Sequence, residues 1–295
     1  MIIVGVNGGG TKTESICCNG DGAIIGKGAS GPSNYNNLGV EKVVKNIHAA
    51  VMQAANADPD FICIALAGMN TKRDFEKLQS ALSKVYKNLL LEHDAFAELY
   101  GVRRGKPGVI VIAGTGSIAL GYDGNRVYRR CDNGYFLGDS GSGYYIGKEG
   151  LKITARMLLE DMEPTDLASD ILRHLGLNSA DDLMEWTYSE KNTVASVAAI
   201  GNIVCNSAEK GDKNAKAIVD LASSSVGNAA CELALKLHVD TVYIKGGIAK
   251  SSLYYSNFSQ IMAAKGIATK HLKDSQAEGA LLIAADRAGV KVRLP

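Results

Sequence analysis

Short apolar runs of strand length and longer stretches with helical spacing alternate along the first third of the chain. The short runs predict strands at residues 2–6, 15–18, 23–26, 61–66 and 89–92. Helices are expected at residues 40–55, where Val40, Val43, Ile47 and Val51 fall on one face, and at residues 74–86. Strands and helices in this alternation predict an α/β fold.

The pattern of the first residues returns after residue 108. Strands are expected at residues 109–113, 118–121 and 127–131, with a tight turn at residues 114–117. Asp123-Gly124 predicts a hairpin turn, as Asp21-Gly22 does in the first copy. We interpret this repeat as an internal duplication. It predicts two domains, residues 1–105 and 106–295, joined by a linker rich in Arg, Gly and Pro.

The remainder is mainly helical, with expected helices at residues 144–159, 166–175, 194–208 and 215–237. One strand, at residues 241–244, interrupts the helices and leads into Gly246-Gly247. A last helix at residues 277–288 is expected to pack back on the first domain.

Composition narrows the class of protein. Of 295 residues, 46% are hydrophobic and 21% charged, which is typical of a soluble globular protein. The net charge is only +1, without a long basic or acidic run, so neither nucleic acid nor a membrane is expected as main partner. No export signal opens the sequence, and the six cysteines form no C-x-x-C pair. A cytoplasmic protein with free thiols is therefore expected.

Two glycine-rich turns, each after an apolar strand, are candidate phosphate clamps. Glycine lets the backbone approach an anion closely, and consecutive N–H groups can point into one concavity. The candidate nucleotide-binding residues are Gly9, Gly10, Thr11, Lys12 and Thr13 in the first turn, and Gly114, Thr115 and Gly116 in the second. The order Thr11-Lys12 does not fit a P-loop, which also leads into a helix. A plain hairpin turn is the alternative for either run alone, and the presence of both favours phosphate binding.

Two aspartates and a second glycine pair complete the candidate site. Asp94 ends an apolar strand and is the candidate base that accepts a proton from a sugar hydroxyl. Asp139, in a polar glycine-rich turn, is a candidate ligand of sugar hydroxyls. Each could instead cap the N-terminus of the helix that follows it. Gly246-Gly247, after a strand, would let adenine or ribose approach the backbone.

Together these motifs resemble the actin/hexokinase/Hsp70 superfamily. Within it, the chain resembles the BadF/BadG/BcrA/BcrD ATPase family, which includes N-acetylglucosamine kinase and archaeal hexokinases. Residues 3–13 match the first phosphate motif, residues 112–117 the second, and residues 242–247 the adenosine motif. The resemblance implies two ribonuclease-H-like domains around a nucleotide cleft, ATP and Mg²⁺ as cofactors, and a homodimer.

The resemblance also implies an ATP-dependent sugar kinase and its binding residues. It implies that Asn34, Asn70, Asp94, Thr115 and Asp139 bind the sugar. Asn7 stands where relatives usually carry an Asp that holds hydrated Mg²⁺, so this chain keeps an oxygen there but loses a charge. Ile118 replaces a polar pocket residue of N-acetylglucosamine kinases, which weighs against an acetamido sugar.

Three alternatives stay open at this point. A kinase of 2-keto-3-deoxygluconate would need a cation for the substrate carboxylate, and Lys12, Lys72 and Arg73 are candidates. An ATPase activator of a dehydratase or reductase would need iron–sulfur cysteines, and residues 133–144 contain none. The third alternative is a non-catalytic sugar-binding protein, for which no DNA-binding module is evident.

Overall fold

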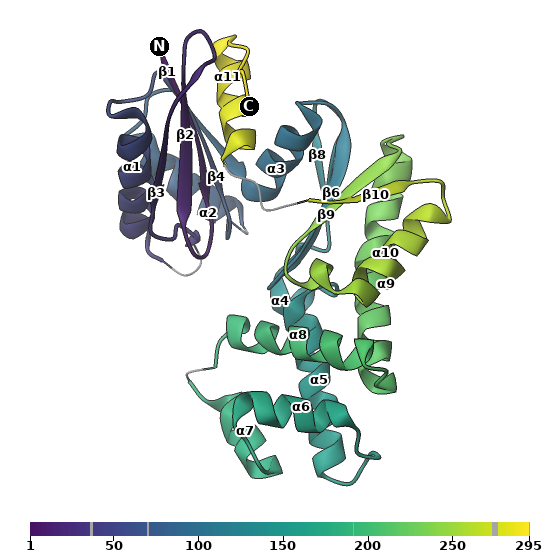
Figure 1. Ribbon diagram of the computed structural model, residues 1–295. Coiled ribbons are helices and arrows are strands. Elements are labelled where there is room, and N and C mark those ends of the chain that lie inside the picture. Colours follow the sequence, from purple (N-terminus) through teal and green to yellow (C-terminus); the bar gives the residue numbers. More distant parts are fainter. Residues whose placement is uncertain (36–37, 70, 191, 273–276, 295) are drawn as a thin grey trace. The chain divides into compact units, whose positions relative to one another are not determined.

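The structure is a computed structural model that describes residues 1–35, 38–69, 71–190, 192–272 and 277–294. The chain divides into two compact units. Unit 1 comprises Met1–Pro107, Tyr122–Asn125 and Asp274–Pro295, and unit 2 comprises Gly108–Gly121 and Arg126–Lys273. Figure 1 traces both units from the N-terminus in purple to the C-terminus in yellow.

Unit 1 contains a five-stranded sheet in the order β3-β2-β1-β4-β5. Its strands are β1 (Ile2–Gly8), β2 (Thr13–Asn19), β3 (Ile24–Ser30), β4 (Phe61–Leu66) and β5 (Leu89–His93). Strands β1, β2 and β3 form an antiparallel meander, whereas β4 pairs parallel with β1 and β5 pairs parallel with β4. The C-terminal ends of β1, β4 and β5 therefore lie along one edge.

Helices cover both faces of this sheet (Figure 1). The first face carries α1 (Val40–Ala55) and α2 (Lys72–Leu82). Its buried core joins Val4, Val6, Val43, Ile47, Ile62 and Ile64. The other face carries α3 (Asp94–Arg103) and α11 (Glu278–Ala288), which pack against each other and against β4.

Helix α1 has the predicted bounds, but α2 differs from the helix predicted at residues 74–86. It begins at Lys72 because Thr71 and Asp74 form a capping box, in which each side chain bonds the other residue's backbone N–H. The helix ends at Leu82, and Tyr86 follows in the next turn. Asp74 is thus the third residue of the helix rather than its start.

Unit 2 repeats the strand order of unit 1. Its sheet, β10-β9-β6-β7-β8, contains β6 (Gly108–Ala113), β7 (Ser117–Tyr122), β8 (Val127–Arg130), β9 (Thr241–Lys245) and β10 (Ala268–His271). Strand β9 runs parallel to β6, as β4 does to β1. The predicted duplication and the α/β, ribonuclease-H-like class are confirmed by this correspondence.

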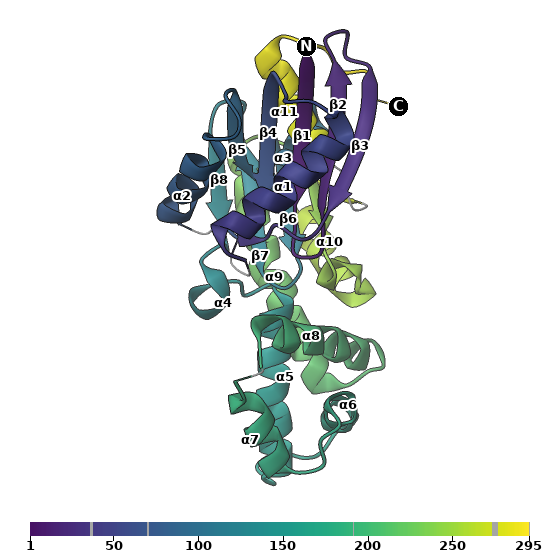
Figure 2. The same cartoon turned by 90° about the vertical axis from the view of Figure 1, so that its left-hand side faces the viewer.

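The α-helices of unit 2 are α4 (Gly134–Leu137), α5 (Gly143–Leu158), α6 (Asp166–Leu175), α7 (Ala180–Tyr188), α8 (Val194–Glu209), α9 (Lys213–Lys236) and α10 (Ser252–Ala263). The helices other than α4 form one core with its sheet, and α4 has no buried residue. Helix α9 packs on β6 and also contacts α5 and α8, and the helices α5 to α8 are seen in the lower half of Figure 2. No helix among the described residues has the length and apolar character to cross a membrane.

The sequence did not predict α7, α10 or β10. Strand β10 has only four residues, three of them exposed, so it has no apolar run to indicate a strand. Helix α10 buries only Tyr254, Phe258 and Met262, and its other positions mix polar and aromatic residues.

Candidate functional site

The first glycine turn connects β1 to β2 and is tied to the loop that carries Asn34. The N–H of Gly9 donates to the carbonyl of Lys12 at 3.0 Å, which closes the turn. The carbonyl of Gly9 accepts from the backbone N–H groups of Ser33 and Asn34, both at 3.0 Å. Gly10, Thr11 and Lys12 remain exposed at the tip. The predicted sugar-binding loop and the predicted phosphate turn therefore lie side by side in unit 1.

Thr13 has a different role from the one predicted. Its side chain is 0% exposed, its hydroxyl donates to the carbonyl of Gly31 at 2.7 Å, and it lies 2.5 Å from the Ser33 hydroxyl. A hydroxyl that is buried and bonded in this way has no surface left for a phosphate oxygen. Thr13 therefore holds the Asn34 loop on the first turn, and the prediction that its hydroxyl binds nucleotide is corrected.

A row of side chains crosses the sheet of unit 1 near this turn. In the strand register Asn7 pairs with Glu14 on β2 and with Ala65 on β4, and Ala65 pairs with Glu92 on β5. Residues paired across neighbouring strands point to the same face of a sheet. Burial raises the pKa of Glu92 to about 7. Glu14 and Glu92 were missed from the sequence, because only the pairing of distant strands reveals them as neighbours of Asn7.

This row fits the outer contacts of a hydrated magnesium ion. Mg²⁺ prefers oxygen ligands, keeps several waters and is usually held by one or two carboxylates together with substrate phosphates. Asn7 offers a neutral amide oxygen, and Glu14 adds a carboxylate beside it, which also pairs with the Lys12 ammonium at 2.8 Å. The described residues contain no group of three or more His, Cys, Asp or Glu placed to hold a metal alone. Most ligands of such an ion would thus have to come from water and nucleotide.

Asp94 is the first residue of α3, directly after β5. His93 occupies the N-cap position, and one carboxylate oxygen of Asp94 accepts from the N–H of Ala95 at 2.8 Å. The side chain is partly exposed. Asp94 thus lies at the C-terminal end of a parallel strand. The alternative that Asp94 is the N-cap of the helix is wrong, because His93 is the N-cap and the bond from Ala95 lies within the first turn. The predicted sugar ligand Asn70 lies outside the described residues.

The second glycine turn connects β6 to β7 and rests on the N-terminus of α5. The carbonyl of Gly114 accepts from the N–H of Gly143 at 2.7 Å, and that of Thr115 accepts from the N–H of Tyr144 at 3.3 Å. The first N–H groups of a helix have no partner inside the helix, so these bonds satisfy both elements. Thr115 stays exposed.

Asp139 lies directly beneath this second turn. It is 7% exposed, and its carboxylate accepts from the N–H of Ser117. A Cβ at Gly116 would lie 3.0 Å from the Asp139 Oδ2 atom, so a larger residue would crowd the carboxylate. Burial raises the pKa of Asp139 to about 6, Asp132 adds to the increase, and the Ser117 bond opposes it. Ser142, not Asp139, caps α5, so the alternative of an N-cap at Asp139 is wrong.

Gly246 brings the predicted adenosine motif to the second turn. Its φ of +116° suits only glycine, and a Cβ there would lie 2.1 Å from the carbonyl oxygen of Ala113. The backbone after β9 thus runs in contact with the end of β6. Gly247, next to it, is exposed.

These elements line a pocket of about 370 Å³, called here the α8 pocket. It is lined by Gly114, Thr115, Ala195, Ala198, Ala199, Asn202, Gly247 and Ile248. Two motifs predicted separately therefore share one concavity within unit 2. The residues from α8 were missed, because alanines on one face of a helix resemble an ordinary packing surface.

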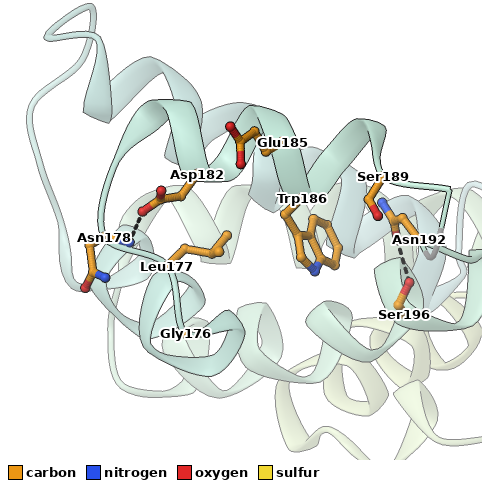
Figure 3. A pocket seen from close by; sticks show the side chains of 9 residues that line it. All are labelled: Gly176, Leu177, Asn178, Asp182, Glu185, Trp186, Ser189, Asn192 and Ser196. Carbon is orange, nitrogen blue, oxygen red and sulfur yellow. Dashed lines mark hydrogen bonds between the residues drawn. The ribbon is translucent and has the colours of Figure 1, made fainter.

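A larger hollow of about 620 Å³ lies between α6, α7 and the start of α8 (Figure 3). The ring of Trp186 faces it, and two pairs of its polar groups already bond one another: Asp182 accepts from the N–H of Asn178 at 2.9 Å, and Asn192 accepts from the Ser196 hydroxyl at 2.5 Å. None of the predicted site residues lines this hollow. Although this hollow is larger than the α8 pocket, the α8 pocket is the better candidate for the nucleotide, because predicted site residues line it.

Relatives with known names resemble the chain over nearly its full length. An N-acetylmuramic acid/N-acetylglucosamine kinase of Clostridium acetobutylicum is 28% identical, over 96% of this chain and 97% of the relative. An N-acetyl-D-glucosamine kinase of Dictyostelium discoideum is 26% identical, over 85% of this chain and 87% of the relative.

Solved structures share the fold. One from Chromobacterium violaceum has a TM-score of 0.74 at 24% identity, covering 96% of this chain and 98% of its own. A ROK family glucokinase from Streptomyces griseus, in complex with glucose and AMPPNP, has a TM-score of 0.55 at 17% identity over 96% of this chain and 98% of its own. These likenesses confirm the predicted two-domain, ribonuclease-H-like architecture.

The match that decides the family is to a family model. It extends over residues 4–284, which include both glycine turns, Asp94, Asp139 and the adenosine motif. The resemblance drawn from those motifs is thereby confirmed: the chain belongs to the BadF/BadG/BcrA/BcrD ATPase family.

Proposed function

We propose that this protein is an ATP-dependent kinase of an amino sugar. The observation that carries the proposal is the α8 pocket, in which the second glycine turn and Gly247 line one concavity. Backbone glycines beside small apolar side chains suit a nucleotide, whose phosphates need N–H donors and whose base needs a flat apolar surface. The named relatives, which are amino-sugar kinases, support the class of reaction.

The residues divide into three groups by their chemistry. The N–H groups of Gly10 to Lys12 and of Thr115 and Gly116 are assigned to the phosphates of ATP, together with the Lys12 ammonium. Gly9 and Gly114, whose N–H groups donate within their own turns, are assigned to the close approach of the backbone to the nucleotide. Thr115 is assigned to both the nucleotide and the sugar. Asn34 and Asp139 are assigned to the sugar hydroxyls, since each is held by its own glycine turn. Asn70 is also assigned to the sugar. Asn7 and Glu14 are assigned to the waters around Mg²⁺.

The reaction needs little covalent chemistry from the protein. A sugar hydroxyl oxygen attacks the γ-phosphorus, the bond to the β–γ bridging oxygen breaks, and ADP leaves. Asp94 accepts the proton of the attacking hydroxyl at its carboxylate. Bound Mg²⁺ would supply positive charge against the phosphate oxygens. The fixed N–H donors of both turns stabilise the charge that develops on the transferred group.

The sugar is proposed to carry nitrogen at its second carbon, because the relatives named above act on N-acetylglucosamine and a third, from Vibrio cholerae, is a glucosamine kinase that is 29% identical over 62% of this chain. Ile118 is partly buried in β7. Its side chain offers no hydrogen bond to an acetamido group, which weighs against N-acetylglucosamine, whereas the names of the relatives favour it. Glucosamine and N-acetylglucosamine are therefore both candidates. None of these relatives is named for 2-keto-3-deoxygluconate, and that activity is not proposed.

A coupled ADP-release assay tests the proposal. The purified protein is supplied with ATP and Mg²⁺ and with glucosamine, N-acetylglucosamine, glucose, mannose or 2-keto-3-deoxygluconate. Sugar-dependent ADP release is expected, fastest with one of the two amino sugars, with phosphorylated sugar formed in equal amount. ADP release that no sugar accelerates would refute the kinase proposal and favour an ATPase that activates a partner enzyme.

A further inference from the structure

The α8 pocket has two chemically different walls. One consists of the second glycine turn and Gly247, where the lining is mostly backbone. The other is a face of α8 formed by Ala195, Ala198, Ala199 and Asn202. These four positions are spaced i, i+3, i+4 and i+7, so they fall on one side of the helix.

Asn202 is the polar side chain on the helical wall. The alanines beside it and Ile248 opposite have no hydrogen-bonding side-chain atoms, and Thr115 belongs to the turn. Asn202 is exposed, and its carboxamide takes part in no hydrogen bond within the described part of the chain. A carboxamide presents one acceptor and two donors at adjacent positions. Its chemistry therefore suits a ligand edge that carries a donor next to an acceptor.

We propose that Asn202 makes the α8 pocket selective for adenine over guanine. This inference rests on the proposed function, because it assumes that the nucleotide base enters this pocket. Adenine presents the N6 amino donor beside the N7 acceptor, and an asparagine side chain can bond both at once. With the same N7 edge turned towards Asn202, guanine presents two acceptors, O6 and N7, so the Asn202 oxygen would face another oxygen without a proton between them.

The alanine face explains how the base reaches Asn202. Ala195 and Ala199 are exposed and Ala198 is 7% exposed, so none of the three projects more than a methyl group into the pocket. A planar base can lie along such a surface with its apolar face covered, and its polar edge then meets the next residue of the same row. That residue is Asn202. A discrimination of about 10- to 100-fold between the two bases is expected from one such bidentate pair.

The test is the ratio of ADP to GDP affinity, measured by isothermal titration calorimetry. It compares the unmodified protein with Asn202→Ala and, as the matched control, Asn206→Ala. Asn206 is an exposed asparagine one turn further along α8 that does not line the pocket. Both substitutions remove an exposed amide from the same helix and introduce a better helix former, so both variants should fold.

The unmodified protein should bind ADP at least about 10-fold more tightly than GDP. Asn202→Ala should bring the ratio close to one, mainly by weakening ADP, and Asn206→Ala should leave it unchanged. An unchanged ratio in Asn202→Ala, or no preference in the unmodified protein, overturns the inference. Failure of the proposed kinase function is seen separately, as ADP release from ATP that no sugar accelerates, and does not depend on this ratio.

Discussion

Replacing Asp94 by asparagine separates two roles that this residue can have. Asp94 begins α3, and its carboxylate accepts from the N–H of Ala95 at 2.8 Å. Asparagine keeps the side-chain oxygen and therefore the hydrogen bond, but it cannot take a proton from a sugar hydroxyl at neutral pH. If Asp94 is the base, Asp94→Asn should lose turnover while the fold survives.

The expected magnitudes differ enough to decide. A positioned general base contributes about 10²- to 10⁴-fold in rate, or roughly 3–5 kcal/mol of transition-state stabilisation. Loss of a negative charge in the first turn of a helix costs about 0.3–1 kcal/mol of folding stability. A domain with a stability of about 5 kcal/mol remains more than about 99% folded after that loss. Unfolding therefore cannot account for a hundredfold fall in turnover.

The assay measures kcat and KM for ATP and sugar, together with urea unfolding. Asp74→Asn is the control, because Asp74 also lies in the first turn of a helix and bonds the N–H of Thr71 at 3.0 Å. Both variants should lose similar, small amounts of stability. Only Asp94→Asn should lose kcat, by about 100-fold or more, with ADP binding retained. Comparable kcat values in the two variants would show that Asp94 serves the helix and not the chemistry.

Three further expectations concern the pocket, the buried aspartate and the metal. Ala199→Leu should weaken ADP binding about 10-fold or more, because the larger side chain fills the α8 pocket. The free energy of unfolding should not change, because Ala199 is exposed. An unaltered dissociation constant for ADP would place the nucleotide elsewhere. Folded Asp139 keeps its proton up to a pKa of about 6, above the ordinary value of 3.8. Its contribution to unfolding free energy should therefore fall as pH rises from 4 to 6, by at most about 1.4 kcal/mol per pH unit. Asp139→Asn should lack this loss in urea titrations across that range. Asn7→Asp adds a negative charge and should lower the Mg²⁺ concentration needed for half-maximal turnover about tenfold. The Mg²⁺ concentration needed for half-maximal ADP binding should fall by a similar factor. No shift in either concentration would mean that this position does not face the metal.

The sequence predicted those parts of the fold and site that depend on local pattern. The bounds of β4, α1 and α6 agree with the predicted ranges, because apolar runs and helical spacing are local properties. Both glycine turns occur between strands as expected. The duplication was also visible, because hairpin signals such as Asp123-Gly124 recur in the same order.

The missed features depend on contacts between distant segments. Thr13 appeared to be a phosphate ligand because hydroxyls are common in such turns, but its bond to Gly31 buries it. Asp139 appeared able to cap a helix, but its φ of +56° is left-handed, whereas the residue that caps α5, Ser142, has an extended backbone. The wall of the α8 pocket is about 80 residues from the second turn in sequence. No short sequence motif predicts a pocket wall that is formed by segments so far apart in the sequence.

Helix α8 borders two hollows at once: Ser196 faces the one beside Trp186, and its neighbours Ala195 and Ala199 face the other. Trp186 is the single tryptophan of the chain. Its fluorescence therefore comes from one known position, next to the helix that a nucleotide would touch. In a titration of the unlabelled protein with ADP, any change at the start of α8 can be followed as a shift in tryptophan emission. Trp186 therefore serves as an intrinsic fluorescence probe of this region.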